Sequence, residues 1–237
     1  MTQTTAYNGR LGNQIFRNLA VSLIAEKNDL NVHYANAGLI ESLGIKLFSG
    51  KQLHSASIKL TDDNYFSVYE TALSANLDAN ASYLQTQSIS NLLYNHLRAN
   101  QASIVEKNPF QERYQRNNDV HVHIRLTDVA HHNPGAKYYL EALASIGPYD
   151  TLYLSSDNLK HPIVEQIVAQ HPATLLHYDE IKTFQFASTC RHQILSHGSF
   201  SAVIGYLSFF SEVHYPNYGV SKMWYGDMFS IPGWVKH

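Results

Sequence analysis

Strand-type and helix-type segments alternate along the second half of the chain, and this alternation limits the folds that it can adopt. Short apolar runs predict strands at residues 120–124, 150–155, 173–177, 193–196 and 213–215. Apolar residues at helical spacing predict helices between them at residues 138–146, 162–169, 180–189 and 200–209. Strands that alternate with helices form parallel sheets with right-handed crossovers. The sequence therefore predicts an α/β fold for this half.

The first half shows a similar but less regular alternation. Strands are expected at Thr4–Tyr7, Leu30–Ala35 and Tyr83–Gln85. Helices are expected at about residues 15–28, 38–43 and 89–104, the last ending before Pro109. Residues 48–80 have only short apolar runs, which support no assignment.

The length of 237 residues suits one large domain or two small ones. The segment Asn108–Asn118 is polar and contains Pro109, a composition typical of an inter-domain linker. We therefore expect an N-terminal domain at residues 1–115 and a C-terminal domain at residues 116–237.

Composition excludes several classes of protein. With 44% hydrophobic and 15% charged residues the chain can bury a core, and a net charge of −2 gives no reason to expect nucleic acid or an anionic membrane as partner. One cysteine, Cys190, excludes an intramolecular disulfide. No apolar run approaches 18 residues, and the polar start resembles no signal peptide. We expect a soluble cytoplasmic protein without a membrane span, and its oligomeric state stays open.

The predicted strand at 120–124 is followed at once by an arginine. Apolar residues at 120, 122 and 124 alternate with His121, His123 and Arg125, and Asp128 follows in a polar loop. Open α/β sheets bind ligands at the carboxyl ends of their strands. The arginine fork suits phosphate, and an acid three residues on can hold it. The other interpretation is a strand that ends in an ordinary surface ion pair.

Two more predicted strands end in polar residues. Together with Arg125 and Asp128, these ends contribute Ser156, Asp157, His197, Gly198 and Ser199. The loops of a doubly wound sheet that follow its strands lie on one edge, so a cation, acids, hydroxyls and a helix amino end would meet there. This combination predicts a site for a nucleotide diphosphate and its ribose.

A glycine turn, Gly9–Gln14, lies between the first predicted strand and helix. Free N–H groups at such a helix start favour an anion. The spacing is neither a dinucleotide fingerprint nor a P-loop, and a simple tight turn is the other interpretation.

Four segments in order resemble the GDP-fucose-dependent α-1,2-fucosyltransferases and their protein O-fucosyltransferase relatives. Gly9-Arg-Leu-Gly-Asn-Gln14 is similar to their G-x-x-G-N-Q signature, and His123-Ile-Arg-Leu-Thr-Asp128 resembles their H-x-R-R-x-D donor motif. Leu154-Ser-Ser-Asp157 resembles F-S-D-D, and Ser196-His-Gly-Ser-Phe-Ser201 resembles the start of N-S-S-F-S-W-W. These segments span residues 9 to 205.

The resemblance implies a GT-B-like fold, with two Rossmann-like halves facing across a cleft, and an inverting, metal-independent transfer of L-fucose from GDP-fucose to a hydroxyl of a glycan acceptor. Arg125 would stabilise the leaving diphosphate, with Arg10 and Asn13 as further catalytic residues. The remaining donor-binding positions that it implies are Gly9, Gly12, Gln14, His123, Asp128, Ser156, Asp157, His197, Gly198, Ser199, Phe200 and Ser201. Among these, His123 and Asp128 would orient Arg125, and Asp157 would take the nucleoside. No cofactor is implied beyond the GDP-sugar substrate.

Departures from the family pattern leave the sugar and the acceptor open. Leu126 stands in place of a second arginine, His197-Gly198 replace Asn-Ser, and Ala202-Val203 replace two tryptophans. Another GDP-sugar such as mannose or rhamnose would need a similar diphosphate clamp, and a non-catalytic sugar-nucleotide or glycan-binding protein is an alternative. Asp62, Asp63 and His132 are weakly placed candidates for the general base.

A metal site is the alternative from a different class. His121 and His123 share one face of their predicted strand, and His131 and His132 follow in the next loop. Imidazole nitrogens at such spacing can chelate a transition metal, although no matched motif supplies a third ligand.

Overall fold

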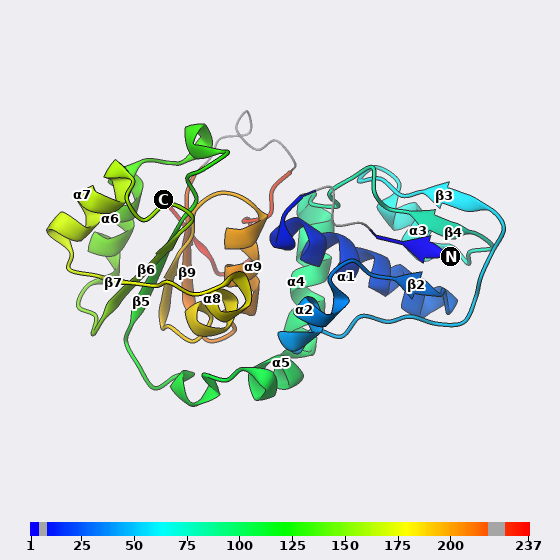
Figure 1. The fold of residues 1–237 in the computed structure, drawn as a ribbon, viewed down its shortest axis with the longest axis horizontal. Coiled ribbons are helices and arrows are strands. Elements are labelled where there is room, and N and C mark those ends of the chain that lie inside the picture. The colour runs from blue at the N-terminus through cyan, green and yellow to red at the C-terminus, as the bar shows by residue number, and fades with distance from the viewer. Residues whose placement is uncertain (5–8, 218–225) are drawn as a thin grey trace. The chain divides into compact units, whose positions relative to one another are not determined.

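A computed structural model describes residues 1–4, 9–217 and 226–237. These residues form two compact units: residues 1–103 with 226–228, and residues 104–217 with 229–237. Each unit holds one sheet in which all hydrogen-bonded neighbours are parallel, with helices around it (Figure 1). The expected α/β class is confirmed in both.

The first unit contains a four-stranded sheet in the order β2-β1-β4-β3. Its strands are β1 (Thr2–Gln3), β2 (Val32–His33), β3 (Ser57–Lys59) and β4 (Asn76–Asp78). Its helices are α1 (Leu11–Asn28), α2 (Ala37–Ser42), α3 (Tyr65–Glu70) and α4 (Gln87–Ala99). Helix α1 contacts both α3 and α4 and is buried along most of its length.

Several predictions for this unit need correction. The strand expected at Thr4–Tyr7 falls mostly on residues 5–8, outside the described residues, and the sheet begins earlier, at β1. The strand expected at Tyr83–Gln85 is wrong, because Leu84 has a left-handed φ of 56° that no strand accommodates. The unassigned stretch 48–80 contains β3, α3 and β4.

The long helix expected at residues 89–104 is two helices, α4 and α5 (Gln101–Lys107). They are separated at Asn100, whose side-chain amide donates to the backbone oxygen of His96 at 2.9 Å. An asparagine that bonds the preceding turn in this way competes with continued helix.

The second unit starts earlier than the expected boundary at residues 115/116, because the polar segment 108–118 packs on this unit. Asn108 is buried and its Nδ2 donates to the backbone oxygen of Gln185 at 2.8 Å. The ring of Phe110 packs edge-on against that of Phe186, with their centroids 5.3 Å apart. The segment expected as a linker, which includes a 3-10 turn, η1 (Gln111–Arg113), is therefore part of the packed unit.

The second sheet has the order β10-β9-β8-β5-β6-β7. Its strands are β5 (Val120–Ile124), β6 (Leu152–Ser156), β7 (Thr174–Leu175), β8 (His192–Ile194), β9 (Glu212–Tyr215) and β10 (Val235–Lys236). Its helices are α6 (Ala136–Ile146), α7 (Pro162–Gln170), α8 (Glu180–Ala187) and α9 (Ser199–Leu207). Helices α6 and α7 cover one face and α8 and α9 the other (Figure 1). The alternation predicted from the sequence is confirmed, and β10 is an addition to it.

Strand β5 is central in this sheet and buried on both faces. Val120, Val122 and Ile124 belong to the apolar core beneath α6 and α7. The opposite face holds buried His121, whose ring nitrogens hydrogen-bond with Gln193 Oε1 at 2.9 Å and Ser155 Oγ at 2.8 Å. The alternation in the sequence thus marks an apolar and a polar buried face, as a parallel sheet covered on both sides allows.

Candidate functional site

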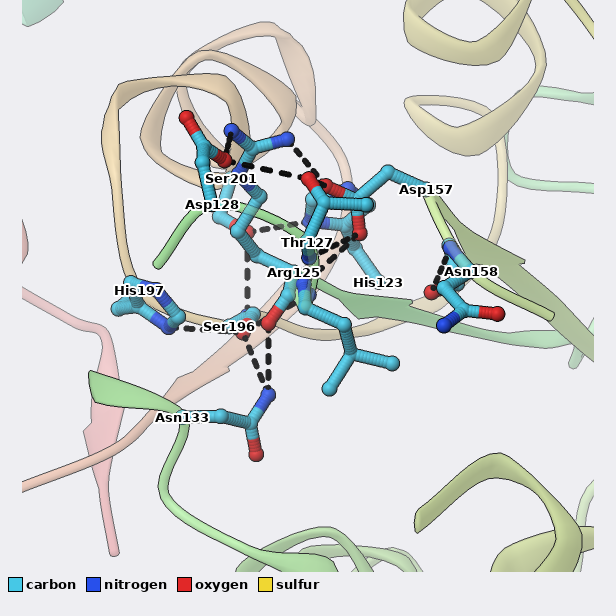
Figure 2. A network of polar contacts seen from close by, with 12 residues as sticks. His123, Arg125, Thr127, Asp128, Asn133, Asp157, Asn158, Ser196, His197 and Ser201 are labelled. Atoms are coloured by element: carbon cyan, nitrogen blue, oxygen red, sulfur yellow. Dashed lines mark hydrogen bonds and ion pairs between the residues drawn. The ribbon is translucent and has the colours of Figure 1, made fainter. Parts of the chain in front are cut away.

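Three strand ends of the second unit meet at one edge of the sheet. Strands β8, β5 and β6 are neighbours; Arg125 and Asp157 directly follow β5 and β6, and Ser196 comes two residues after β8. The backbone N–H of Arg125, after β5, donates to Ser196 Oγ, after β8, at 3.1 Å. The guanidinium of Arg125 forms an ion pair with Asp157, after β6 (Figure 2). The expected convergence of these loops is confirmed.

Two carboxylates hold the guanidinium of Arg125. Its Nη1 contacts Asp157 Oδ2, and its Nη2 contacts Asp128 Oδ1. The Arg125 side chain is 15% exposed, that of Asp157 19% and that of Asp128 54%. Three of the five guanidinium N–H donors lie outside these two contacts. Because Asp128 is the more exposed partner, it is the one that an incoming anion can replace at lower cost.

Asp157 also holds the backbone of the turn that carries Arg125. Its Oδ1 accepts from the N–H of Leu126 at 2.7 Å, and its Oδ2 accepts from Thr127 Oγ1 at 2.6 Å. Burial raises the pKa of the Asp157 carboxyl, but the bonds from Thr127 and Leu126 and the charge of Arg125 bring it below its ordinary value. Asp157 was expected to bind the nucleoside, and Thr127 was not predicted as a site residue. The contacts of Asp157 with Arg125, Leu126 and Thr127 make it a positioning residue for Arg125.

Ser196 also holds the backbone of this turn in place, and it was not predicted as a site residue from the sequence. Its hydroxyl accepts from Tyr139 Oη at 2.8 Å as well as from Arg125 N–H. Asn133 Nδ2 donates to the backbone oxygen of Arg125 and to Tyr139 Oη, both at 2.9 Å. The Asn-Pro-Gly sequence at 133–135 signals a turn, but only the fold brings that turn to Arg125.

His123 differs from its expected role. It was expected to orient Arg125, but its Nδ1 hydrogen-bonds with Ser201 Oγ at 2.5 Å (Figure 2). Its ring also packs on that of Phe200, with centroids 5.0 Å apart. Burial, with a smaller contribution from His121, lowers the pKa of His123 to about 3. A neutral His123 therefore ties β5 to the first turn of α9.

The start of α9 offers backbone donors at the same edge. Gly198 has a φ of 87°, a left-handed value that glycine adopts without strain, and the helix begins at half-buried Ser199. The side chain of Ser201 is used within the protein, since its Oγ also accepts from Ser196 N–H at 3.1 Å. The N–H groups of a first helical turn have no partner within their own helix, and such helix starts bind anions.

His197 and Ser156 complete the predicted residues of this unit. His197 is buried, with Nδ1 3.3 Å from Ser196 Oγ and its ring 6.1 Å from that of His132. Burial, followed by the charges of His132 and Arg125, lowers the pKa of His197 to about 4. Ser156 Oγ accepts from the N–H of Asn158 at 3.0 Å and so shapes the turn after β6.

The glycine turn of the first unit is held together by its own residues. Gly9 has a φ of 99°, and a Cβ there would overlap the amide of Asn13. Gln14 Nε2 donates to the backbone oxygen of Gly9 at 3.0 Å, and Gln85 Nε2 donates to Asn13 Oδ1 at 2.8 Å. The tight turn was the second interpretation of this segment, and these bonds account for its Gly9, Asn13 and Gln14.

The other predicted residues of this turn differ in exposure. Gly12 is buried within the first turn of α1, whereas Arg10 is exposed and directly precedes that helix in extended conformation. Of the two acids considered as a base, Asp63 is exposed, while Asp62 accepts hydrogen bonds from Ser82 Oγ and from Gln85 N–H, the latter at 2.9 Å.

The histidine metal site considered from the sequence does not form. Both ring nitrogens of His121 are hydrogen-bonded, and His123 bonds Ser201. The rings of His131 and His132 contact each other in a tilted arrangement, with centroids 4.0 Å apart. Within the described ranges, the group whose ligand atoms come together is instead His192, Glu212 and His214.

No helix in the described part of the chain is long and apolar enough to cross a membrane. Comparison with known proteins finds no matching family model, no matching curated protein and no matching solved structure.

Proposed function

We propose that the chain is a glycosyltransferase that transfers a sugar from a GDP-sugar, with L-fucose as the first candidate, to a hydroxyl of a glycan. The observation that carries this proposal is the position of Arg125 at the carboxyl edge of a parallel sheet, held on Asp157 beside the first turn of α9. The resemblance of four segments to the fucosyltransferases selects the donor.

The proposed chemistry is a displacement at the anomeric carbon. The acceptor oxygen forms the new bond to that carbon, the bond to the diphosphate oxygen breaks, and the diphosphate leaves with the negative charge. Stabilising that charge without a metal requires fixed cations and N–H donors. Arg125 and the N–H groups at the start of α9 supply both.

The acids around Arg125 set a condition on donor binding. One guanidinium and two carboxylates carry a net charge of −1 in the absence of ligand, which does not favour an anion. Asp157 is fixed by Leu126 and Thr127, so we infer that the diphosphate displaces Asp128 and takes its place on Nη2.

The acceptor hydroxyl must also lose a proton. Of the three base candidates considered, His132 lies in the same unit as Arg125, with its ring next to that of His197. Asp62 and Asp63 lie in the first unit. The GT-B arrangement of the two units is part of the proposal; both units have the parallel α/β sheet that this architecture uses.

A donor-consumption assay with GDP-fucose, GDP-mannose and GDP-rhamnose, in the presence of EDTA, tests the proposal. We expect one GDP-sugar to be consumed by the wild-type chain and by Arg116→Ala, which removes an exposed arginine of the same unit. Arg125→Ala should lose this activity. Binding of a GDP-sugar without any consumption, even with a panel of glycan acceptors, would favour the non-catalytic alternative.

A further inference from the structure

A second group of polar residues lies on the same sheet, at the first residue of β8 and the first and third residues of β9. His192 pairs with Glu212 across the two parallel strands, and His214 follows two residues after Glu212. Residues so related project from the same face of a sheet. The group is separate from the Arg125 site, which follows the last residue of β5.

The ligand atoms of this group have the spacing of a metal site. His192 Nδ1 is 3.5 Å from Glu212 Oε2, and His214 Nε2 is 3.5 Å from Glu212 Oε1. All three ligand atoms lie within 4.8 Å of one another. Ligands bound tetrahedrally to Zn²⁺ at about 2.0–2.1 Å stand roughly 3.4 Å apart. That separation is close to both 3.5 Å distances, each of which joins one histidine nitrogen to a different oxygen of the Glu212 carboxylate.

The two ring nitrogens that face Glu212 have no hydrogen-bond partner among the described residues. His192 is only 8% exposed and His214 only 2%. Buried polar nitrogens are nearly always satisfied, so two of them directed at one carboxylate indicate a missing ligand. The Glu212 side chain is 46% exposed and gives an ion access from solvent.

Neighbouring groups fix the ring protons away from this point. Asn118 Nδ2 donates to Pro148 O at 2.8 Å, which leaves Asn118 Oδ1 facing His192 Nε2 at 3.2 Å. Because that oxygen only accepts, the His192 proton is on Nε2, and Nδ1 presents its lone pair. His214 Nδ1 hydrogen-bonds with His237 Nε2 at 2.8 Å. When His237 accepts this bond, the His214 proton is on Nδ1 and Nε2 presents its lone pair to Glu212.

We propose that His192, Glu212 and His214 bind one divalent transition-metal ion of the Zn²⁺ type, with water in the remaining positions. Imidazole nitrogen and carboxylate oxygen are ligands that Zn²⁺ accepts. The ion links β8 to β9 and stabilises the second unit. It takes no part in the proposed sugar transfer, so the two proposals stand or fall separately.

Calorimetric titration of the EDTA-stripped, buffer-exchanged protein with ZnCl₂ tests this site. We expect one equivalent to bind and the thermal midpoint of unfolding to rise. Glu212→Gln keeps the side-chain size at an exposed position and should abolish stoichiometric binding. The matched control Glu165→Gln, at an exposed position of α7, should bind like the wild type.

A second pair of variants separates the proposed site from other histidines. His192→Gln should lose the bound equivalent, whereas His177→Gln, at an exposed position, should keep it. Asn118→Ala leaves all three ligands and should weaken binding roughly 10–100-fold. Circular dichroism of each variant shows whether it is folded.

Two results would overturn the inference: no stoichiometric binding by the wild type, or equal binding by folded Glu212→Gln and Glu165→Gln. GDP titration of Glu212→Gln gives an independent reading. Unchanged GDP binding is expected, and its loss together with the metal would contradict the separation of the two sites.

Discussion

The glycine turn of the first unit and the arginine turn of the second were both expected to contact the donor, yet their side chains are used differently. In the first, Asn13 and Gln14 are occupied by bonds to Gln85 and Gly9. In the second, Arg125 lies at a sheet edge with its charge held by acids. The side chains of the first turn are therefore accounted for by the hydrogen bonds that hold the turn itself together. The second places a guanidinium at a sheet edge, where it is paired with two acids and has further N–H donors outside those two contacts.

Replacing Arg125 should give the largest effect on function and a small one on stability. Arg125→Ala should reduce transfer by at least roughly 10²–10³-fold, the usual loss for one preorganised donor. The midpoint of unfolding should change less than the activity, because the pair with exposed Asp128 contributes about 0–1 kcal/mol. Without Arg125, Asp157 still accepts hydrogen bonds from Leu126 and Thr127. Steady-state kinetics and thermal unfolding measure the two effects. Wild-type activity in a folded Arg125→Ala variant would contradict a functional role for Arg125.

Replacing Gly9 should give the opposite result, a loss of stability. Gly9→Ala puts a Cβ on the Asn13 amide at a φ of 99°, so it should destabilise the first unit by more than about 1 kcal/mol. Gly38→Ala is the matched control: it lies in α2 with open space around it and should stabilise by roughly 0.5–1 kcal/mol. Urea unfolding followed by circular dichroism compares them. Equal stability of both variants would contradict a structural role for the turn.

The polar interior beneath α9 should make the second unit sensitive to acid. The pKa values of His121 and His123 are lowered by burial to about 4 and about 3. Unfolded histidines take up protons below about pH 6.5 while the folded ones do not, so stability is lost as the pH falls from 6.5 towards 4. The loss is on the order of 1.4 kcal/mol per pH unit for each histidine. Urea unfolding at pH 7.5, 6 and 5 measures it. A flat profile would mean that these rings are not buried.

The two acids around Arg125 should differ from each other. Asp157→Asn removes an ion pair and the acceptor of Thr127 Oγ1, and should weaken GDP binding about tenfold, since hydrogen bonds to charged groups contribute about 1.5–3 kcal/mol. Asp128→Asn changes a pair whose acid is 54% exposed and should alter binding by less than about fivefold. Calorimetric titration with GDP compares the affinities of the two variants. A larger loss in Asp128→Asn would show that Asp128 keeps Arg125 in place when the nucleotide binds.

Local pattern predicted most of the second unit, because its strands and helices bury strongly periodic apolar residues. It predicted little of residues 48–80, where β3, α3 and β4 are short and depend on contacts between distant segments. Strand order is also invisible in the sequence. Without the strand order, β10 was not predicted, and the sequence could not show that His192 and Glu212 are paired on adjacent strands.

The candidate site was predictable in its location but only partly in its contacts. Arg125 and Asp128 are three residues apart and could be paired from the sequence. Asp157 is 32 residues further on than Arg125, and its bonds to Leu126 and Thr127 depend on β5 and β6 being neighbours. Ser196 and Asn133 were missed for the same reason, since the fold alone brings them to the Arg125 backbone.

The most direct test of the central claim is calorimetric titration of the wild-type chain and of Arg125→Ala with GDP, UDP, GMP and ADP in the presence of EDTA. We predict that GDP binds the wild type most tightly, that GMP binds more weakly because it lacks the second phosphate, and that Arg125→Ala loses GDP binding while Arg116→Ala keeps it. Tighter binding of UDP would contradict the choice of a GDP-sugar. Absence of binding by any of the four nucleotides would contradict the nucleotide-diphosphate site itself.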